Sequence, residues 1–140
     1  GFGKACEVCM QEYAERDRIK YLRDKLETIL MNSMKDSEIH GKHAVRLPNT
    51  ISIAFPGTDA QALVIDLDLN KIAVSTGAAC SSGSIEPSHV LAAMNLPTDQ
   101  LMSTIRISLG RFSTEDEIIS AGETIIDSVD KIKQQLPNIE

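Results

Sequence analysis

Residues Ile51–Phe55 read ISIAF, in which apolar side chains alternate with small or polar ones, and this alternation is typical of a β-strand with one buried face. Pro56 and Gly57 follow directly and end the strand. The stretch Ile105–Leu109, IRISL, alternates in the same way. It therefore predicts a second such strand, with Arg106 on the face opposite its apolar neighbours.

Helical periodicity precedes the first strand. Apolar residues at steps of three and four predict one long helix from about Ala5 to Met34, although the stripe is interrupted over residues 15–20. Residues 35–43 are polar and charged, which is typical of a surface loop. Pro48 then holds the chain extended where it enters the strand.

Capping boxes mark two of the later helices. Residues 58–61, TDAQ, predict a helix that ends near Asn70. Residues 114–117, TEDE, predict a helix that continues to about Pro137. Residues 87–94 are expected to form a short helix, because proline is tolerated in a first helical turn.

A short apolar run, Ile72–Val74, completes the pattern as a third strand. The order is then helix, strand, helix, strand, helix, strand, helix, which indicates an α/β (α+β layered) domain. We expect a small three-stranded sheet with helices packed on it and a long N-terminal helix. The length of 140 residues fits a single domain over residues 1–140.

The composition restricts the partners and the setting. Fourteen Lys and Arg and 20 Asp and Glu give a net charge of −6, which argues against nucleic acid or an anionic membrane as the main partner unless a local basic patch exists. No apolar run approaches the roughly 18 residues that span a bilayer. The odd number of three cysteines argues against a secreted disulfide framework and predicts a reducing, cytoplasmic setting.

Cys80 lies in the middle of residues 75–84, STGAACSSGS, a stretch without a bulky side chain. Gly77 and Gly83 flank it, and the composition predicts a mobile loop whose thiol could reach two places. From the residues alone, Cys80 is either a reactive thiol or a small residue in a tight turn or phosphate-cradling loop. The loop lacks the Walker ending and the G-x-G-x-x-G spacing, which argues against a phosphate cradle. His89 could act as a base for Cys80, although it is most simply a surface or capping histidine.

Arg106 has two interpretations. Most strand arginines extend along a sheet face to solvent, but a guanidinium fixed on a rigid strand also suits bidentate capture of a carboxylate. Cys6 and Cys9 form a C-x-x-C, a spacing found in redox pairs and in half of a zinc site. Only His40 and His43 lie nearby as further ligands, and no strand precedes the pair. We therefore expect no metal site, and small packing residues that are buried or half-exposed on the helix.

Four segments taken together resemble the C-terminal part of cysteine desulfurases. The resemblance is to the iron-sulfur-cluster type with a long catalytic loop, within the fold-type I, class V aminotransferase superfamily, and it covers essentially the whole chain. The segments occur in the family's order and spacing: RLPNT at residues 46–50, AVSTGAACSSGS at 73–84, EPSHVL at 86–91 and IRISLGRF at 105–112.

The resemblance implies the small domain of an enzyme that converts L-cysteine to L-alanine and keeps the sulfur as a persulfide. In that family a mobile-loop cysteine attacks the sulfur of a substrate bound to pyridoxal phosphate, and Cys80 occupies its position. An arginine in the segment IRISLGR holds the substrate carboxylate, and Arg106 occupies that position. The intact enzymes are homodimers that pass sulfur to an iron-sulfur scaffold or another acceptor protein.

The family's Schiff-base lysine belongs to a Ser-His-Lys segment of the large domain, and this sequence has no such segment. The resemblance therefore implies a small domain without its pyridoxal phosphate domain, and we expect the chain alone neither to bind the cofactor stably nor to turn over cysteine. Two alternatives stay open: a stand-alone sulfur carrier or persulfide relay that uses Cys80, and an inactive interaction domain derived from the enzyme. Cys6 and Cys9 match no segment of the family.

Overall fold

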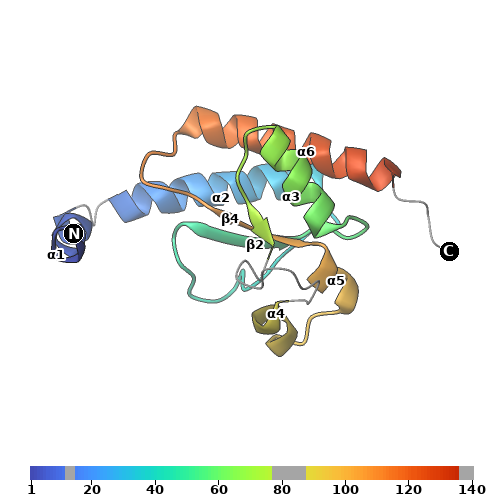
Figure 1. Ribbon diagram of the computed structural model, residues 1–140, viewed down its shortest axis with the longest axis horizontal. Coiled ribbons are helices and arrows are strands. Elements are labelled where there is room, and N and C mark those ends of the chain that lie inside the picture. The colour runs from blue at the N-terminus through green and yellow to red at the C-terminus, as the bar shows by residue number, and fades with distance from the viewer. Residues whose placement is uncertain (12–14, 77–87, 136–140) are drawn as a thin grey trace.

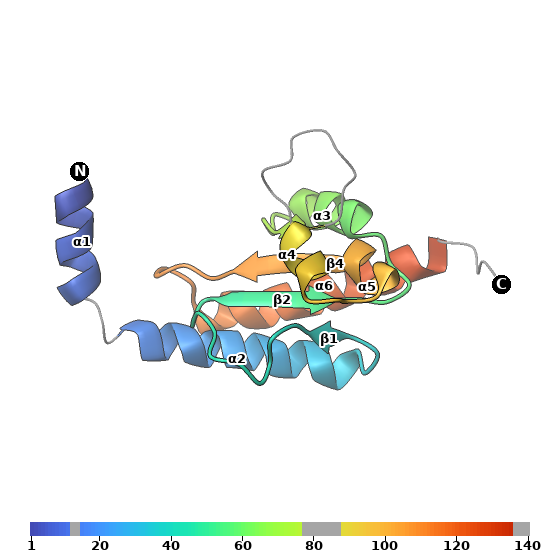
Figure 2. The same cartoon turned by 90° about the horizontal axis from the view of Figure 1, so that it is seen from below.

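The structure, a computed structural model, describes residues 1–11, 15–76 and 88–135. One face of a small sheet is covered by three helices (Figure 1): α2 (Glu15–Ser33), α3 (Ala60–Leu69) and α6 (Glu115–Gln135). Two short helices, α4 (His89–Ala93) and α5 (Thr98–Met102), lie on the other side of the sheet, and Figure 2 views the molecule from that side. The prediction of an α/β layered fold with helices packed on a sheet is confirmed.

The sheet has four strands in the order β1-β2-β4-β3, and all neighbouring strands are antiparallel. Its central strands, β2 (Thr50–Ala54) and β4 (Thr104–Ser108), are the two strands expected from the alternation. The edge strands, β1 (Glu38–Ile39) and β3 (Ser75–Thr76), have two residues each. The prediction of three strands is wrong because β1 lies in the expected loop, where a single buried isoleucine, Ile39, makes no alternation.

The predicted strand at Ile72–Val74 is also wrong, since β3 begins only at Ser75. Helix α3 ends in a Schellman motif: the Ile72 N–H donates to the Leu67 carbonyl (2.9 Å) and the Lys71 N–H to the Asp68 carbonyl (3.0 Å). Because the N–H of Ile72 closes the helix, the chain pairs with the sheet only after it has left this motif.

Of the two capping boxes predicted from the sequence, one is present and one is replaced by a cap at the next residue. At α6 the predicted box is confirmed, because the Thr114 N–H donates to Glu117 Oε2 (2.8 Å) and the Glu117 N–H to Thr114 Oγ1 (3.3 Å). At α3 the cap is Asp59, whose carboxylate accepts from the Ala62 N–H at 2.8 Å, and the predicted box at Thr58 is wrong. The Thr58 hydroxyl is engaged in the turn before the helix instead.

The long N-terminal helix of the prediction is two helices, α1 (Phe2–Gln11) and α2, which point in different directions (Figures 1 and 2). The predicted interruption of the apolar stripe, residues 15–20, lies inside α2 and does not mark the division between the two helices. Leu22, Leu26 and Leu30 of α2 are buried, whereas most of α1 is exposed. Helix α1 therefore has no core to pack against in the described part of the chain.

The core lies between the sheet and the helices α2, α3 and α6. Gly122 permits the close approach of α6 to α2, because a Cβ at residue 122 would lie 2.8 Å from Cγ2 of Ile29 on α2. The largest fully buried apolar side chains are Phe55, Leu26, Leu30, Ile51, Ile53, Leu63, Leu67, Ile105, Ile125 and Val129. Because the core packs against one face of the sheet, the side chains of the opposite face point away from the core.

Candidate functional site

The sheet face that turns away from α2, α3 and α6 carries Arg106. The register pairs Arg106 of β4 with Ser52 of β2 and with Ser75 of β3, so these side chains form one row across the sheet. Arg106 is exposed, whereas its neighbour Ile105 is fully buried. Among the described residues, no hydrogen bond or ion pair engages the Arg106 guanidinium. The arginine therefore lies on the face predicted for it, with its charge available to a ligand.

A cavity of about 290 Å³ opens beside this arginine. The sheet and the segment before β2 supply its polar wall, and α4 supplies an apolar wall. The lining residues are His40, Gly41, Arg46, Ser52, Ser88, Val90, Leu91, Met94 and Arg106. A guanidinium and hydroxyls facing an apolar wall suit a small molecule that carries a carboxylate.

His40 is a buried residue of the same cavity. Its Nε2 lies 3.0 Å from the Thr104 hydroxyl, which itself donates to the Gln100 carbonyl at 2.5 Å. The hydroxyl can then only accept from His40, which places the ring proton on Nε2 and leaves Nδ1 as an acceptor. Nδ1 is buried and has no hydrogen-bond partner among the described residues. Burial lowers the pKa of His40, which agrees with a neutral ring.

Cys80, the predicted nucleophile, lies outside the described residues. The described chain stops at Thr76 before it and resumes at Ser88 after it. Thr76 pairs with Ile105, the neighbour of Arg106, and Ser88 is buried and lines the cavity. Both ends of the segment that contains Cys80 therefore lie close to Arg106.

Cys6 and Cys9 are both exposed on α1. The prediction that they pack, buried or half-exposed, on the helix is wrong, because α1 extends away from the core. Within residues 1–11, 15–76 and 88–135, no three or more His, Cys, Asp and Glu side chains are grouped so as to hold a metal ion. In the same part of the chain, no helix combines the length and apolar character needed to cross a membrane.

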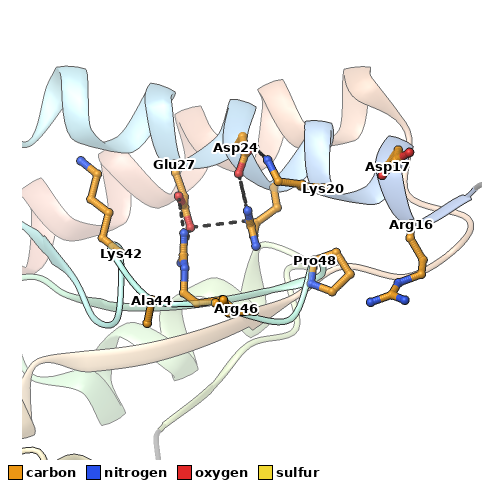
Figure 3. Close-up of a pocket in the computed structure, with 11 residues that line it drawn as sticks. Arg16, Asp17, Lys20, Asp24, Glu27, Lys42, Ala44, Arg46 and Pro48 are labelled. Carbon is orange, nitrogen blue, oxygen red and sulfur yellow. Dashed lines mark hydrogen bonds and ion pairs between the residues drawn. The ribbon is translucent and has the colours of Figure 1, made fainter.

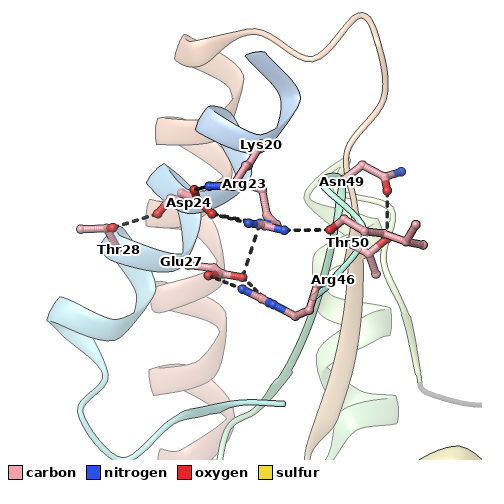
Figure 4. Close-up of polar contacts among 9 residues, drawn as sticks. Lys20, Arg23, Asp24, Glu27, Thr28, Arg46, Asn49 and Thr50 are labelled. Carbon is pink, nitrogen blue, oxygen red and sulfur yellow. Dashed lines mark hydrogen bonds and ion pairs between the residues drawn. The ribbon is translucent and has the colours of Figure 1, made fainter. Parts of the chain in front are cut away.

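A group of ion pairs that the sequence did not predict joins α2 to the segment before β2 (Figure 4). Arg46 binds Glu27 through two bonds of 2.7 and 3.1 Å, which raises the pKa of Arg46. Arg23 binds Asp24 at 2.6 Å, and burial opposes but does not overcome the bonds from Lys20 and Arg23 that lower the pKa of Asp24. The spacing of Arg23 and Glu27, four residues apart on one helix, was the available signal.

The described residues do not form a pyridoxal phosphate site by themselves. That cofactor is held through a lysine, with an acidic or arginine partner at its pyridine nitrogen. No lysine and no carboxylate lines the cavity beside Arg106 in the described part of the chain. Three of the lysines are engaged elsewhere: Lys20 with Asp24, Lys25 with Glu115 and Lys131 with Asp66.

Known proteins are similar to this chain in sequence and in fold. Curated proteins named cysteine desulfurase from Enterobacter agglomerans and Nostoc sp. are 39% and 40% identical to the chain over 137 and 139 residues. Each match covers 98% of this chain but 34% of the relative, so the chain spans about a third of the length of these relatives. Cysteine desulfurase NifS of Azotobacter vinelandii is 39% identical, over 99% of the chain and 34% of the relative.

Solved structures give the same result. A NifS-like protein matches with a TM-score of 0.77 at 30% identity, covering 91% of this chain and 32% of the other. A NifS-like protein from Rickettsia africae matches with a TM-score of 0.64 at 35% identity, covering 85% and 29% of the two chains. Residues 1–120 match the family model Aminotransferase class-V, a family that generally depends on pyridoxal phosphate. This chain therefore belongs to the aminotransferase class-V family, among relatives that are cysteine desulfurases.

Proposed function

We propose that this chain is the C-terminal small domain of a cysteine desulfurase, to which it contributes Cys80 as nucleophile and Arg106 as the residue that binds the substrate carboxylate. One observation carries the proposal: among the described residues, an exposed, unpaired Arg106 lies on the sheet face opposite α2, α3 and α6, and both ends of the Cys80 segment lie close to it.

The carboxylate assignment is supported by the position of Arg106. A guanidinium binds a carboxylate best through two parallel hydrogen bonds, which requires a fixed orientation. The central strand β4 gives Arg106 such a base, because pairing with Ser52 and Ser75 holds its backbone on both sides. The serine neighbours are small, so they leave room for a ligand above the sheet.

Chain connectivity supports the role of Cys80. Cys80 lies four residues after Thr76, the last residue of the strand beside Arg106. Four residues span at most about 14 Å, so the backbone of Cys80 lies within that distance of Thr76. In the proposed step, the Cys80 thiolate bonds to the sulfur of L-cysteine. The substrate C–S bond breaks, its electron pair stays with carbon, and that carbon takes a proton and leaves as L-alanine. Pyridoxal phosphate supplies the chemistry that stabilises negative charge at such a carbon.

The described residues lack a cofactor site, so the proposal assigns that site to the rest of the enzyme. We expect the chain alone not to release alanine from cysteine. The same proposal makes the intact enzyme a cytoplasmic homodimer that delivers persulfide sulfur to an iron-sulfur scaffold or another acceptor protein. Its support is the likeness to proteins named cysteine desulfurase, IscS and NifS.

The test joins the chain to a pyridoxal phosphate domain, either its own or the remaining two thirds of the Enterobacter relative, and supplies L-cysteine. The expected results are alanine release and a gain of one sulfur atom in the intact mass of the protein. Cys80→Ala should abolish the sulfur gain, and Cys9→Ala should retain it as the matched control. A protein that binds cofactor but gains no sulfur at Cys80 would contradict the assignment and favour an inactive interaction domain. Sulfur uptake by the chain alone from a persulfide donor would favour a stand-alone carrier.

A further inference from the structure

A second hollow lies between α2 and the segment before β2, and we call it the α2 groove (Figure 3). Its volume is about 620 Å³, and it shares Arg46 with the cavity beside Arg106. The lining residues are Arg16, Asp17, Lys20, Arg23, Asp24, Glu27, Lys42, Ala44, Val45, Arg46 and Pro48. The proposed reaction uses none of them.

The groove is positive although the chain is negative. Its lining contains five basic and three acidic residues, whereas the whole chain has a net charge of −6. Lys20, Arg23 and Arg46 share the two carboxylates of Asp24 and Glu27, so cations exceed their partners even inside the ion-pair group (Figure 4). Basic residues are thus in excess over acidic residues in the lining, which favours a negatively charged occupant.

The groove is held in shape before any partner binds. The Arg23 side chain is 6% exposed, and its Nη1 donates to the Leu47 carbonyl at 2.8 Å, which ties the segment before β2 to α2. Arg46 is held from the same side by Glu27. A groove of fixed shape reduces the conformational entropy that the protein loses when a ligand binds.

Apolar side chains flank the charges. Val45 is 104% exposed, and Leu47 is 67% exposed. Both side chains point outward because the backbone between them carries Arg46 inward to Glu27. A partner that fills this region therefore needs carboxylates for the groove and apolar groups for its rim.

We propose that the α2 groove binds an acidic segment of a partner protein that carries apolar side chains among its carboxylates. A nucleic acid fits less well, because the described lining residues include no aromatic side chain for base stacking and include three carboxylates that repel phosphates. The inference does not rest on Cys80 or on the proposed reaction, so either can fail without the other.

Fluorescence anisotropy of the 140-residue chain with a labelled peptide of Glu, Asp and Leu tests the proposal. We expect saturable binding that weakens as salt is added, and no binding of the matching peptide of Gln, Asn and Leu. Lys42→Glu, at an exposed residue of the groove, should weaken binding by about fivefold or more, since it replaces an attraction with a repulsion. Lys35→Glu, an exposed lysine outside the lining, makes the same change in net charge and should leave binding unchanged.

Four outcomes would overturn the proposal. The first is no binding of the acidic peptide, and the second is an equal loss in Lys42→Glu and Lys35→Glu, which would show attraction without a site. The third is tighter binding of a single-stranded RNA oligonucleotide than of the peptide. A full-length protein that no longer binds the peptide would assign the groove to contact with the rest of the enzyme instead of a separate partner.

Discussion

The two faces of the strand pair β2–β4 differ residue by residue. On one face, Ile51, Ile53 and Ile105 are fully buried under the helices. On the other, Ser52 is half-buried and Arg106 is exposed. Burying one such isoleucine contributes about 1.5 to 3 kcal/mol relative to leaving it exposed. The first face thus stabilises the fold, while the second is accessible to a ligand around Arg106 and is buried at its other end, at Ala54 and Thr104.

This separation has a consequence for mutations. Adjacent residues of a single strand, such as Ile105 and Arg106, are expected to affect different properties of the protein, because they contact different surroundings. A change on the covered face should alter stability, and a change on the open face should alter ligand binding. The following variants test that division.

The largest effect is expected on the covered face. Ile53→Ala removes a fully buried side chain from the centre of the sheet and should lower the free energy of unfolding by about 2 to 5 kcal/mol. Ser52→Ala, the next residue on the opposite face, is the matched control and should change it by less than about 0.5 kcal/mol. Urea denaturation monitored by circular dichroism measures both, and similar losses in the two variants would contradict the division.

A smaller effect is expected where the covering helices touch each other. Gly122→Val would place side-chain atoms against Ile29, because even a Cβ at residue 122 would come within 2.8 Å of Cγ2. We expect a loss of about 1 to 3 kcal/mol from overpacking, also measured by urea denaturation. The double variant Gly122→Val with Ile29→Ala should recover part of the loss, and a double variant no more stable than Gly122→Val would place the strain elsewhere.

His40 and Thr104 close one end of the open face, and their contact predicts a pH dependence. Burial lowers the pKa of His40, so the unfolded chain binds the proton more readily. The stability from the neutral ring is present above the unfolded pKa of about 6.5 and decreases as the pH falls below it. The urea midpoint should therefore fall more between about pH 7.5 and 5.5 in the native chain than in His40→Gln. Equal decreases would exclude His40 as the cause.

The smallest effect on stability is expected at the centre of the open face. Arg106→Ala removes no described contact and should change the free energy of unfolding by less than about 0.5 kcal/mol. In the assembled desulfurase of our proposal it should lower kcat/KM for L-cysteine by about tenfold to a hundredfold, because a charged hydrogen-bonded contact is lost. Arg106→Lys should restore charge but not the two-bond geometry. Full activity of Arg106→Ala would reject the carboxylate role.

The elements with strong local signals were the ones predicted well. The alternation at residues 51–55 and 105–109 and the capping box at Thr114 depend on neighbours in sequence, and all three are confirmed. The strand β1 and the start of β3 were not predicted, because a two-residue strand has no period and is defined by the strand that it pairs with.

The residues of the candidate site likewise fall into those that could be predicted from the sequence and those that could not. The side of the strand on which Arg106 lies followed from the period of two, and the choice of Cys80 followed from the resemblance. The cavity, the buried His40 and the contact of Arg46 with Glu27 were not predictable from the sequence. Each joins residues that lie far apart along the chain, as Arg46 and Glu27 are 19 residues apart and His40 and Thr104 are 64 residues apart.

The sequence by itself determined the strands that bury one face, the helices that cover them and the family to which the residues point, because hydrophobic period, capping and motif order are local properties of the chain. Only the tertiary structure decided which residues far apart in the sequence are in contact. It directed α1 away from the core on which α2 packs, buried His40 as a neutral ring against Thr104, and placed excess cations in a groove of a negatively charged chain. These depend on packing between distant segments, and such contacts leave no periodic trace in the order of residues.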